Sequence, residues 1–152
     1  MKFKNDAHGK HAKLIHQAGE IMGTRTKRVL IVDDDHDIRQ TLHIMLADEG
    51  YQVETAADGD AALRILGASH DPLPVFLDVM MPRVDGVDVL RAVASDPSLK
   101  RHVFTLMTAA HRTLPMDLVR LMQQLDVDII WKPFEDINMI PLALTKMEQR
   151  LH

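Results

Sequence analysis

The chain has no cysteine among its 152 residues. That lack excludes disulfides, thiolate metal sites and a thiol nucleophile, and it favours a reducing, cytoplasmic setting. Long apolar runs are missing as well. The residues from Met1 to Gly23 alternate Lys and His with short apolar pieces, and they never form the continuous apolar run of a signal peptide or a membrane span. We therefore expect a cytoplasmic protein that has no membrane partner.

Positive charge is scarce in most of the chain. The residues before Val29 carry a net charge of +5, whereas the remainder carries −9. An acidic body argues against nucleic-acid binding, because contacts to phosphates need a basic surface. The length and the 46% hydrophobic content are typical of one globular domain. We expect residues 1–27 to form a flexible basic extension, with a short helix over 11–22 as the alternative, and residues 28–152 to form the domain.

From Arg28 onward, short β-rich runs alternate with amphipathic segments, and the pattern repeats five times. It predicts an α/β fold with a doubly wound, five-stranded parallel sheet flanked by five helices. The first helix should follow Asp35 or His36 as N-cap and stop at Gly50. Pro141 would break a helix interior, so the last helix should begin near Asn138. The expected strands are 29–32, 52–56, 74–77, 103–107 and 128–131, and the remaining helices are 60–66, 87–94 and 115–125.

Polar side chains stand where the expected strands end. Asp33, Asp34 and Asp35 follow the first strand, Asp78 follows the third, and the fourth and fifth are followed by Thr108 and Lys132. In an open parallel sheet ligands bind at the carboxyl ends of the strands, so these groups should converge on one edge. Converging carboxylates repel one another unless a cation keeps them ionised. Their oxygen atoms suit Mg²⁺ or Mn²⁺, and we expect Asp34 and Asp78 to be direct ligands.

Such a site supports phosphoryl transfer to a carboxylate. An ionised Asp78 can attack phosphorus while the cation, Lys132 and the Thr108 hydroxyl neutralise the charge that develops on the phosphoryl oxygens. Four segments carry a family resemblance: Val29-Leu-Ile-Val-Asp-Asp-Asp35, Phe76-Leu-Asp-Val-Met-Met-Pro-Arg-Val-Asp-Gly86, Leu106-Met-Thr-Ala109 and Trp131-Lys-Pro-Phe134. Together they resemble the receiver domain of two-component response regulators, from about Arg28 to the C-terminus.

The resemblance implies a flavodoxin-like receiver fold of the stand-alone type and a role for each matching residue. Asp78 would be the phosphoacceptor, Thr108 the switch hydroxyl and Lys132 the phosphate-binding lysine. The metal would be held by Asp34, Asp78, the Met80 backbone carbonyl and, through water, Asp33. Lys132-Pro133 fits a cis peptide that turns the lysine toward the site.

It also implies a function and partners. A sensor histidine kinase or a histidine phosphotransfer protein would donate the phosphoryl group, and a downstream protein would read the fourth helix, fifth strand and fifth helix. The chain would be a monomer or weak dimer that phosphorylates and dephosphorylates itself, and not a conventional enzyme. The alternative is a phosphorelay intermediate that passes the group on to a histidine phosphotransfer protein.

A calcium-binding loop and a phosphatase are two alternative interpretations, and particular residues argue against each of them. A calcium loop over Asp33 to Ile44 would have Ile38 at its glycine position and no bidentate Glu at its end. A haloacid-dehalogenase-like phosphatase would need an acidic pair on a strand after Lys132 and would leave Asp78 unexplained.

One departure from the receiver pattern concerns the readout of the switch. Family members usually carry an aromatic residue three positions before the lysine, where this chain has Ile129. Trp131 lies two residues on, hence on the same side of the expected strand. It supplies either an alternative aromatic contact to a partner or a packing residue.

Overall fold

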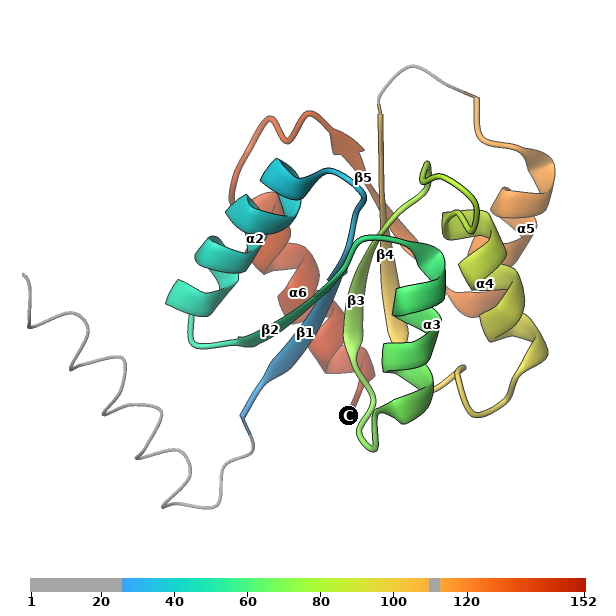
Figure 1. Ribbon diagram of the computed structural model, residues 1–152, viewed down its shortest axis with the longest axis horizontal. Helices are drawn as coiled ribbons and strands as arrows, with labels where there is room; N and C mark the ends of the chain where they lie inside the picture. The colour runs from blue at the N-terminus through green and yellow to red at the C-terminus, as the bar shows by residue number, and fades with distance from the viewer. Residues whose placement is uncertain (1–25, 110–112) are drawn as a thin grey trace, which may run out of the picture.

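The computed structural model describes residues 26–109 and 113–152, and it confirms the predicted fold class (Figure 1). Five parallel strands form one sheet in the order β2-β1-β3-β4-β5. The expected basic extension lies almost entirely outside the described residues. The strands are β1 (Arg28–Val32), β2 (Gln52–Ala56), β3 (Pro74–Asp78), β4 (Val103–Ala109) and β5 (Asp128–Lys132). The helices are α2 (His36–Asp48), α3 (Gly59–Ala68), α4 (Gly86–Ser95), α5 (Met116–Leu125) and α6 (Met139–Arg150).

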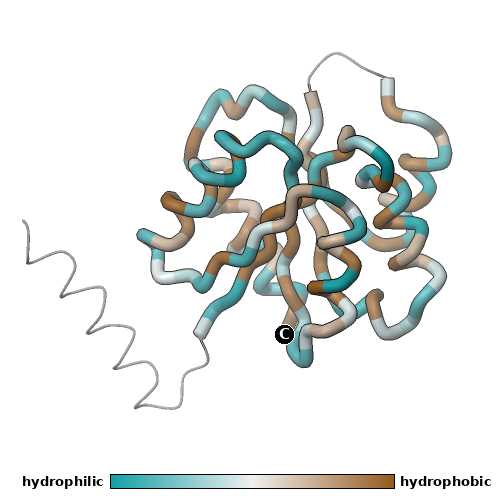
Figure 2. Tube along the Cα trace, viewed as in Figure 1, coloured by the Kyte–Doolittle hydropathy of each residue, from teal (hydrophilic) through white to brown (hydrophobic). Residues whose placement is uncertain are grey.

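Helices cover both faces of the sheet, and each face has its own apolar core. Successive strand residues point to opposite faces. In β1, Leu30 and Val32 therefore pack beneath α3, α4 and α5, while Val29 and Ile31 pack beneath α2 and α6 (Figure 1). Figure 2 shows apolar residues gathered along the central strands, as expected for strands that are buried on both faces.

The helix boundaries follow the local signals in the sequence. The Asp35 carboxylate accepts hydrogen bonds from the backbone N–H groups of Asp37 and Ile38, so it caps α2 as predicted. Helix α6 begins at Met139, which places Pro141 in its first turn, where no intrahelical donor is needed. Of the helices in the described ranges, the longest, α2, has 13 residues, and none has the length and apolar composition that crossing a bilayer requires.

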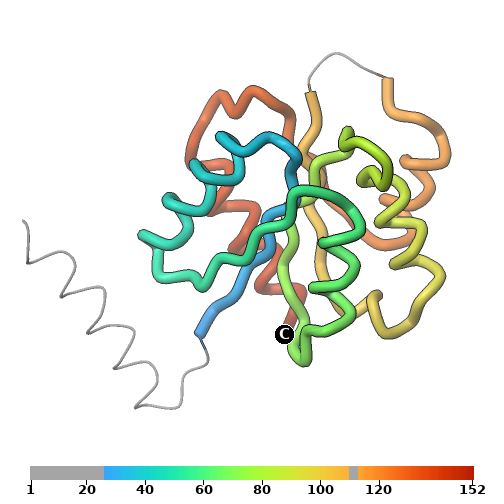
Figure 3. The backbone as a smooth tube through the Cα atoms, viewed as in Figure 1, coloured from blue at the N-terminus to red at the C-terminus, as the bar shows by residue number. Residues whose placement is uncertain are grey.

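The strand ends differ slightly from the prediction, and the difference bears on the site. Strands β3 and β5 each continue for one residue beyond the expected end, and therefore include Asp78 and Lys132. The reason is tertiary: parallel pairing continues through Asp78↔Met107 and Ala109↔Lys132. Both side chains thus project from paired backbone and not from loops. The start of β1 and the C-terminus lie at the opposite end of the sheet (Figure 3).

Candidate functional site

Three carboxylates meet at the carboxyl ends of β1 and β3. Asp33, Asp34 and Asp78 each offer an oxygen atom, and these oxygens all lie within 4.8 Å of one another. Asp33 is fully buried and Asp78 is 6% exposed, whereas Asp34 is open to solvent. Two buried acids beside an exposed one form an oxygen-rich group with one accessible side. This donor set suits a hard divalent cation that keeps some of its water.

Asp33 is held in place through both its side chain and its backbone. Its Oδ1 accepts the N–H of Asp35 at 2.9 Å, and its Oδ2 lies 2.6 Å from the Lys132 ammonium. Its backbone carbonyl accepts a hydrogen bond of 2.7 Å from the Arg39 guanidinium of α2. These contacts anchor the loop between β1 and α2, and they orient the acidic pair toward Asp78. Sequence reasoning missed Arg39, since a helical Arg that bonds a carbonyl six residues earlier leaves no recognisable pattern.

Lys132 joins the two buried acids across the sheet. Its ammonium Nζ lies 2.6 Å from Asp33 Oδ2 and 3.3 Å from Asp78 Oδ1. Burial lowers the pKa of Lys132, but its hydrogen bond to Asp33 and the charges of Asp78 and Asp33 outweigh this and raise that pKa above its usual value. The lysine therefore stays cationic between the two acids. The Lys132-Pro133 peptide bond that follows is cis, as predicted.

Asp78 lies in the least favourable environment for a charge. Burial and the charge of the neighbouring Asp33 together raise the pKa of its carboxyl to about 7, against the opposing effect of Lys132. A carboxyl that titrates near neutral pH is typical of functional sites. A divalent cation at the three oxygens would keep Asp78 ionised, because it adds positive charge where Lys132 alone does not suffice.

The backbone behind Asp78 is packed against the start of α4. Asp85 caps this helix in a reciprocal pair with Asp88, and the Gly86 N–H donates to the Val79 carbonyl at 2.9 Å. A Cβ atom on Gly86 would lie only 2.5 Å from the Asp78 carbonyl oxygen and 2.8 Å from the Val79 Cα. Only glycine allows this close approach, so Gly86 helps to position Asp78.

Replacing Gly86 with Ala should therefore destabilise the protein and weaken its affinity for a divalent cation. We expect a loss of about 2 kcal/mol in the free energy of unfolding, since the clash involves backbone that cannot rotate away. Gly67→Ala is the matched control, because a Cβ there meets nothing within 4 Å and α3 would gain helix propensity. Urea unfolding and Mg²⁺ titration of both variants check this. Equal stability of the two variants would contradict the packing argument.

The remaining predicted residues lie in β4 and β5 or directly after β3. Thr108 is buried in β4, one residue beyond Met107, the register partner of Asp78. The Met80 side chain, just after β3, is 52% exposed. Ile129 is half-buried against the core beneath α5, while Trp131 is 40% exposed. Trp131 is thus partly exposed at the surface, and its two predicted roles, a contact to a partner and packing, both stay open.

The fold and the site define a class of protein. A doubly wound parallel sheet with acidic groups and a lysine at the carboxyl ends of its strands is a flavodoxin-like domain suited to a cation and a phosphoryl group. The family follows from direct comparison. The model of the response regulator receiver domain matches residues 29–143, so the chain belongs to this family of two-component signalling proteins.

Relatives and solved structures agree with the family. The response regulator MprA of Mycolicibacterium vanbaalenii is 50% identical over 68 residues, or 45% of this chain and 29% of that protein. The chain thus matches less than a third of that relative's length. The Vibrio cholerae chemotaxis protein CheY4 is 29% identical, with a TM-score of 0.64 over 84% of this chain and all of the other. A CheY-like receiver domain protein of Methanospirillum hungatei is 28% identical, with a TM-score of 0.69 over 82% of this chain and 97% of that one.

Proposed function

We propose that the chain accepts a phosphoryl group on Asp78 from a sensor histidine kinase and acts as a phosphorylation-dependent switch. The observation that carries the proposal is the pair of contacts from the Lys132 ammonium to Asp33 and Asp78, beside three converging carboxylates. This arrangement combines a nucleophile, a cation site and a fixed positive charge. We also propose that the receiver domain extends over residues 28–152, since α6 continues to Arg150, beyond the family match.

The chemistry assigns a task to each side chain. An ionised oxygen of Asp78 forms a bond to phosphorus while the bond to the donor's imidazole nitrogen breaks, and the electron pair leaves with that nitrogen. Asp34, Asp78 and the Met80 carbonyl would hold Mg²⁺ or Mn²⁺ directly, and Asp33 would bind it through water. When bound, the cation neutralises the phosphoryl oxygens and favours the ionised form of Asp78.

The phosphoryl group then changes the balance of contacts at Lys132. It adds a charge of about −1.5 to −2 and three strong acceptor oxygens next to Asp78. Lys132, now shared between Asp33 and Asp78, gains a stronger anionic partner, and the Thr108 hydroxyl can donate to a phosphoryl oxygen. Both residues lie at the ends of strands that lead to α5 and α6. The new contacts bias a pre-existing equilibrium of those elements.

The surface formed by α5, β5 and α6 is the proposed output face. Ion pairs connect its parts: Lys146 of α6 lies 3.0 Å from Asp128 of β5, and Arg150 lies 3.1 Å from Asp126 at the end of α5. Trp131 of β5 is 40% exposed on this surface. An exposed tryptophan is a common anchor in protein interfaces. Family members usually carry an aromatic residue at the position of Ile129. We propose that Trp131 takes over this role here and contacts a downstream protein.

The experiment that tests the proposal treats the full chain with Mg²⁺ and either beryllofluoride or a small phosphodonor. Trp131 is the only tryptophan in the sequence and lies beside Lys132, so its fluorescence should change when the site is filled. Intact mass should increase by one phosphoryl group with the phosphodonor. If neither the fluorescence nor the mass changes, the proposed mechanism is wrong. Rapid loss of the label to a histidine phosphotransfer protein would assign the relay role instead.

A further inference from the structure

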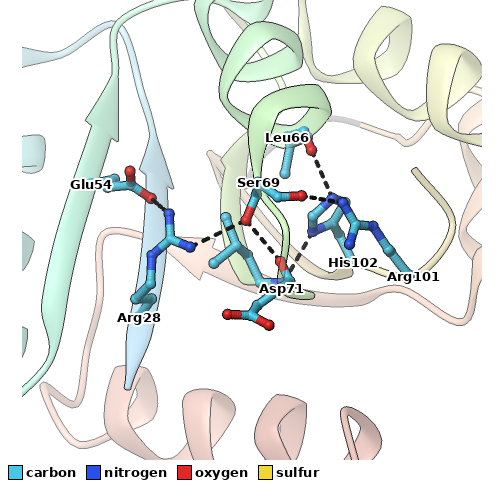
Figure 4. Close-up of polar contacts among 8 residues, drawn as sticks. Arg28, Glu54, Leu66, Ser69, Asp71, Arg101 and His102 are labelled. Atoms are coloured by element: carbon cyan, nitrogen blue, oxygen red, sulfur yellow. Dashed lines mark hydrogen bonds and ion pairs between the residues drawn. The ribbon is translucent and has the colours of Figure 1, made fainter. Parts of the chain in front are cut away.

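A buried histidine lies at the end of the domain opposite the candidate site. His102 stands just before β4 and is 4% exposed. Its Nδ1 lies 3.0 Å from the backbone nitrogen of Leu73, which donates, and its Nε2 lies 3.0 Å from the backbone carbonyl of Leu66 (Figure 4). A carbonyl only accepts, so Nε2 carries the hydrogen, and Nδ1 must be bare to accept the N–H of Leu73. Both contacts are satisfied only by the neutral ring.

The ring closes the connection between α3 and β3. Leu66 belongs to the last turns of α3, and Leu73 immediately precedes β3, so His102 bonds both ends of residues 67–72. Arg101 adds hydrogen bonds to the backbone carbonyls of Ser69 and His70. These contacts draw the connection against the segment that leads into β4.

Ser69 links the same connection to the edge of the sheet. Its hydroxyl donates to the Asp71 carbonyl at 2.8 Å and lies 3.3 Å from the guanidinium of Arg28 in β1 (Figure 4). Arg28 in turn lies 2.8 Å from Glu54 of β2. A proton added to the His102 ring would break the hydrogen bond from the Leu73 N–H, because Nδ1 is its acceptor, while Nε2 would still donate to the Leu66 carbonyl.

We propose that His102 is a proton-sensitive lock on the α3–β3 connection, and that protonating its ring releases residues 67–73 while the sheet stays folded. A proton on Nδ1 removes the acceptor for Leu73 and sets two N–H groups against each other. It also places a charge inside the protein. Each of these effects disfavours the closed connection.

The charged groups around the ring set the pH range. Burial lowers the pKa of His102, and the nearby cations Arg101 and Arg28 add to this against the favourable Leu66 carbonyl. Asp71 belongs to the connection itself, but its carboxylate points away from the ring (Figure 4), and His70 is exposed. Since the folded pKa lies below the ordinary value of about 6.5, the stabilisation is complete above pH 6.5 and is lost as the pH falls through the folded pKa.

Release would have a structural consequence at this end of the domain. Asp71, Pro72 and Leu73 form one wall of a groove of about 680 Å³, whose other wall includes Thr26 and the C-terminal turn of α6. Opening the connection would therefore widen this groove. The candidate phosphorylation site lies at the other end of the sheet and should keep its geometry.

Hydrogen exchange of the full-length chain tests the lock. We expect protection of the amides in residues 67–73, corrected for intrinsic exchange rates, to fall several-fold, up to about tenfold, between about pH 7.5 and pH 5.5. In His102→Gln the fall should be less than about twofold, because the amide side chain offers a donor and an acceptor and does not titrate. His70→Gln, a neighbouring exposed histidine, should behave as the wild type, and all three proteins should bind beryllofluoride equally at the higher pH.

Two results would overturn the proposal. One is an equal pH-dependent loss of protection in the wild type and His102→Gln. The other comes from nitrogen NMR of the His102 ring in the wild type, which applies even if the variant does not fold. A ring that is protonated on Nδ1 at neutral pH, or that titrates at its ordinary value without any change in residues 67–73, would show that the contacts are not a lock.

Discussion

Replacing Asp78 with Asn is expected to abolish phosphorylation and, at the same time, to stabilise the metal-free protein at neutral and higher pH. The amide cannot attack phosphorus, so labelling by a small phosphodonor should disappear. Stability should rise because the ionised carboxylate is buried beside Asp33, which raises the pKa of Asp78 to about 7. Two independent readouts, mass and unfolding, therefore report on one substitution.

The stability effect has a defined pH dependence. A group whose folded pKa exceeds its unfolded value stabilises the folded state at low pH, and this contribution is lost as the pH rises through the folded pKa. Wild-type protein in EDTA should thus lose stability between about pH 4 and pH 7, while Asp78→Asn should not. At about pH 8 we expect the variant to be more stable by about 1–2 kcal/mol in urea unfolding, since Lys132 offsets part of the repulsion.

Asp60→Asn is the matched control for this experiment, because Asp60 is an exposed acid in the first turn of α3. It should be labelled like the wild type and follow the same dependence of stability on pH. Equal labelling of Asp78→Asn and the wild type would move the phosphoacceptor to another residue. A variant that is unlabelled but loses stability with pH as the wild type does would contradict the electrostatic account of Asp78.

Replacing Lys132 with Gln is expected to slow phosphorylation about 10²- to 10³-fold, a loss comparable to the removal of one fixed donor from a charge-stabilising site. Its affinity for Mg²⁺ should not fall, and we expect it to rise. The ammonium now lies 2.6 Å from Asp33 and 3.3 Å from Asp78, so it competes with any cation for the same carboxylates. Transfer rates at saturating Mg²⁺, together with Mg²⁺ titration, separate the two effects.

Lys146→Gln serves as the control for Lys132. Lys146 pairs with Asp128 on the surface of α6, where its side chain is 64% exposed, so both rate and affinity should stay within about twofold of the wild type. If Lys132→Gln loses Mg²⁺ affinity in proportion to its rate, the lysine organises the carboxylates and does not act on the phosphoryl group. If the rate is unchanged, Lys132 has no part in the transfer.

The strands and helices were largely predictable because their signals are local. The β-rich runs, the capping Asp35 and the early Pro141 act through residues only a few positions away. The residues at the strand ends were predictable for a similar reason. Parallel strands bring their carboxyl ends to one edge, whatever their order across the sheet.

The sequence by itself therefore determined the α/β class, the strand and helix boundaries to within about two residues, and the convergence of Asp33, Asp78, Thr108 and Lys132 on one edge of the sheet. The tertiary structure decided how these groups meet. The Lys132 ammonium forms a hydrogen bond to Asp33, which lies 99 residues away in the chain. This contact depends on the order of the strands, because β3 and β4 lie between β1 and β5 and fix the distance between their ends.

Electrostatics and exposure were likewise decided by packing. The raised pKa of Asp78 depends on its burial in the folded protein. The partial exposure of Trp131 depends on how much of β5 the neighbouring elements cover. The hydrogen bonds of Arg39 and His102 reach backbone groups that no sequence pattern marks. Local sequence patterns predict which residue types stand at the end of a strand. The distances between these side chains and the desolvation of their charges depend on contacts between residues that are far apart in the chain.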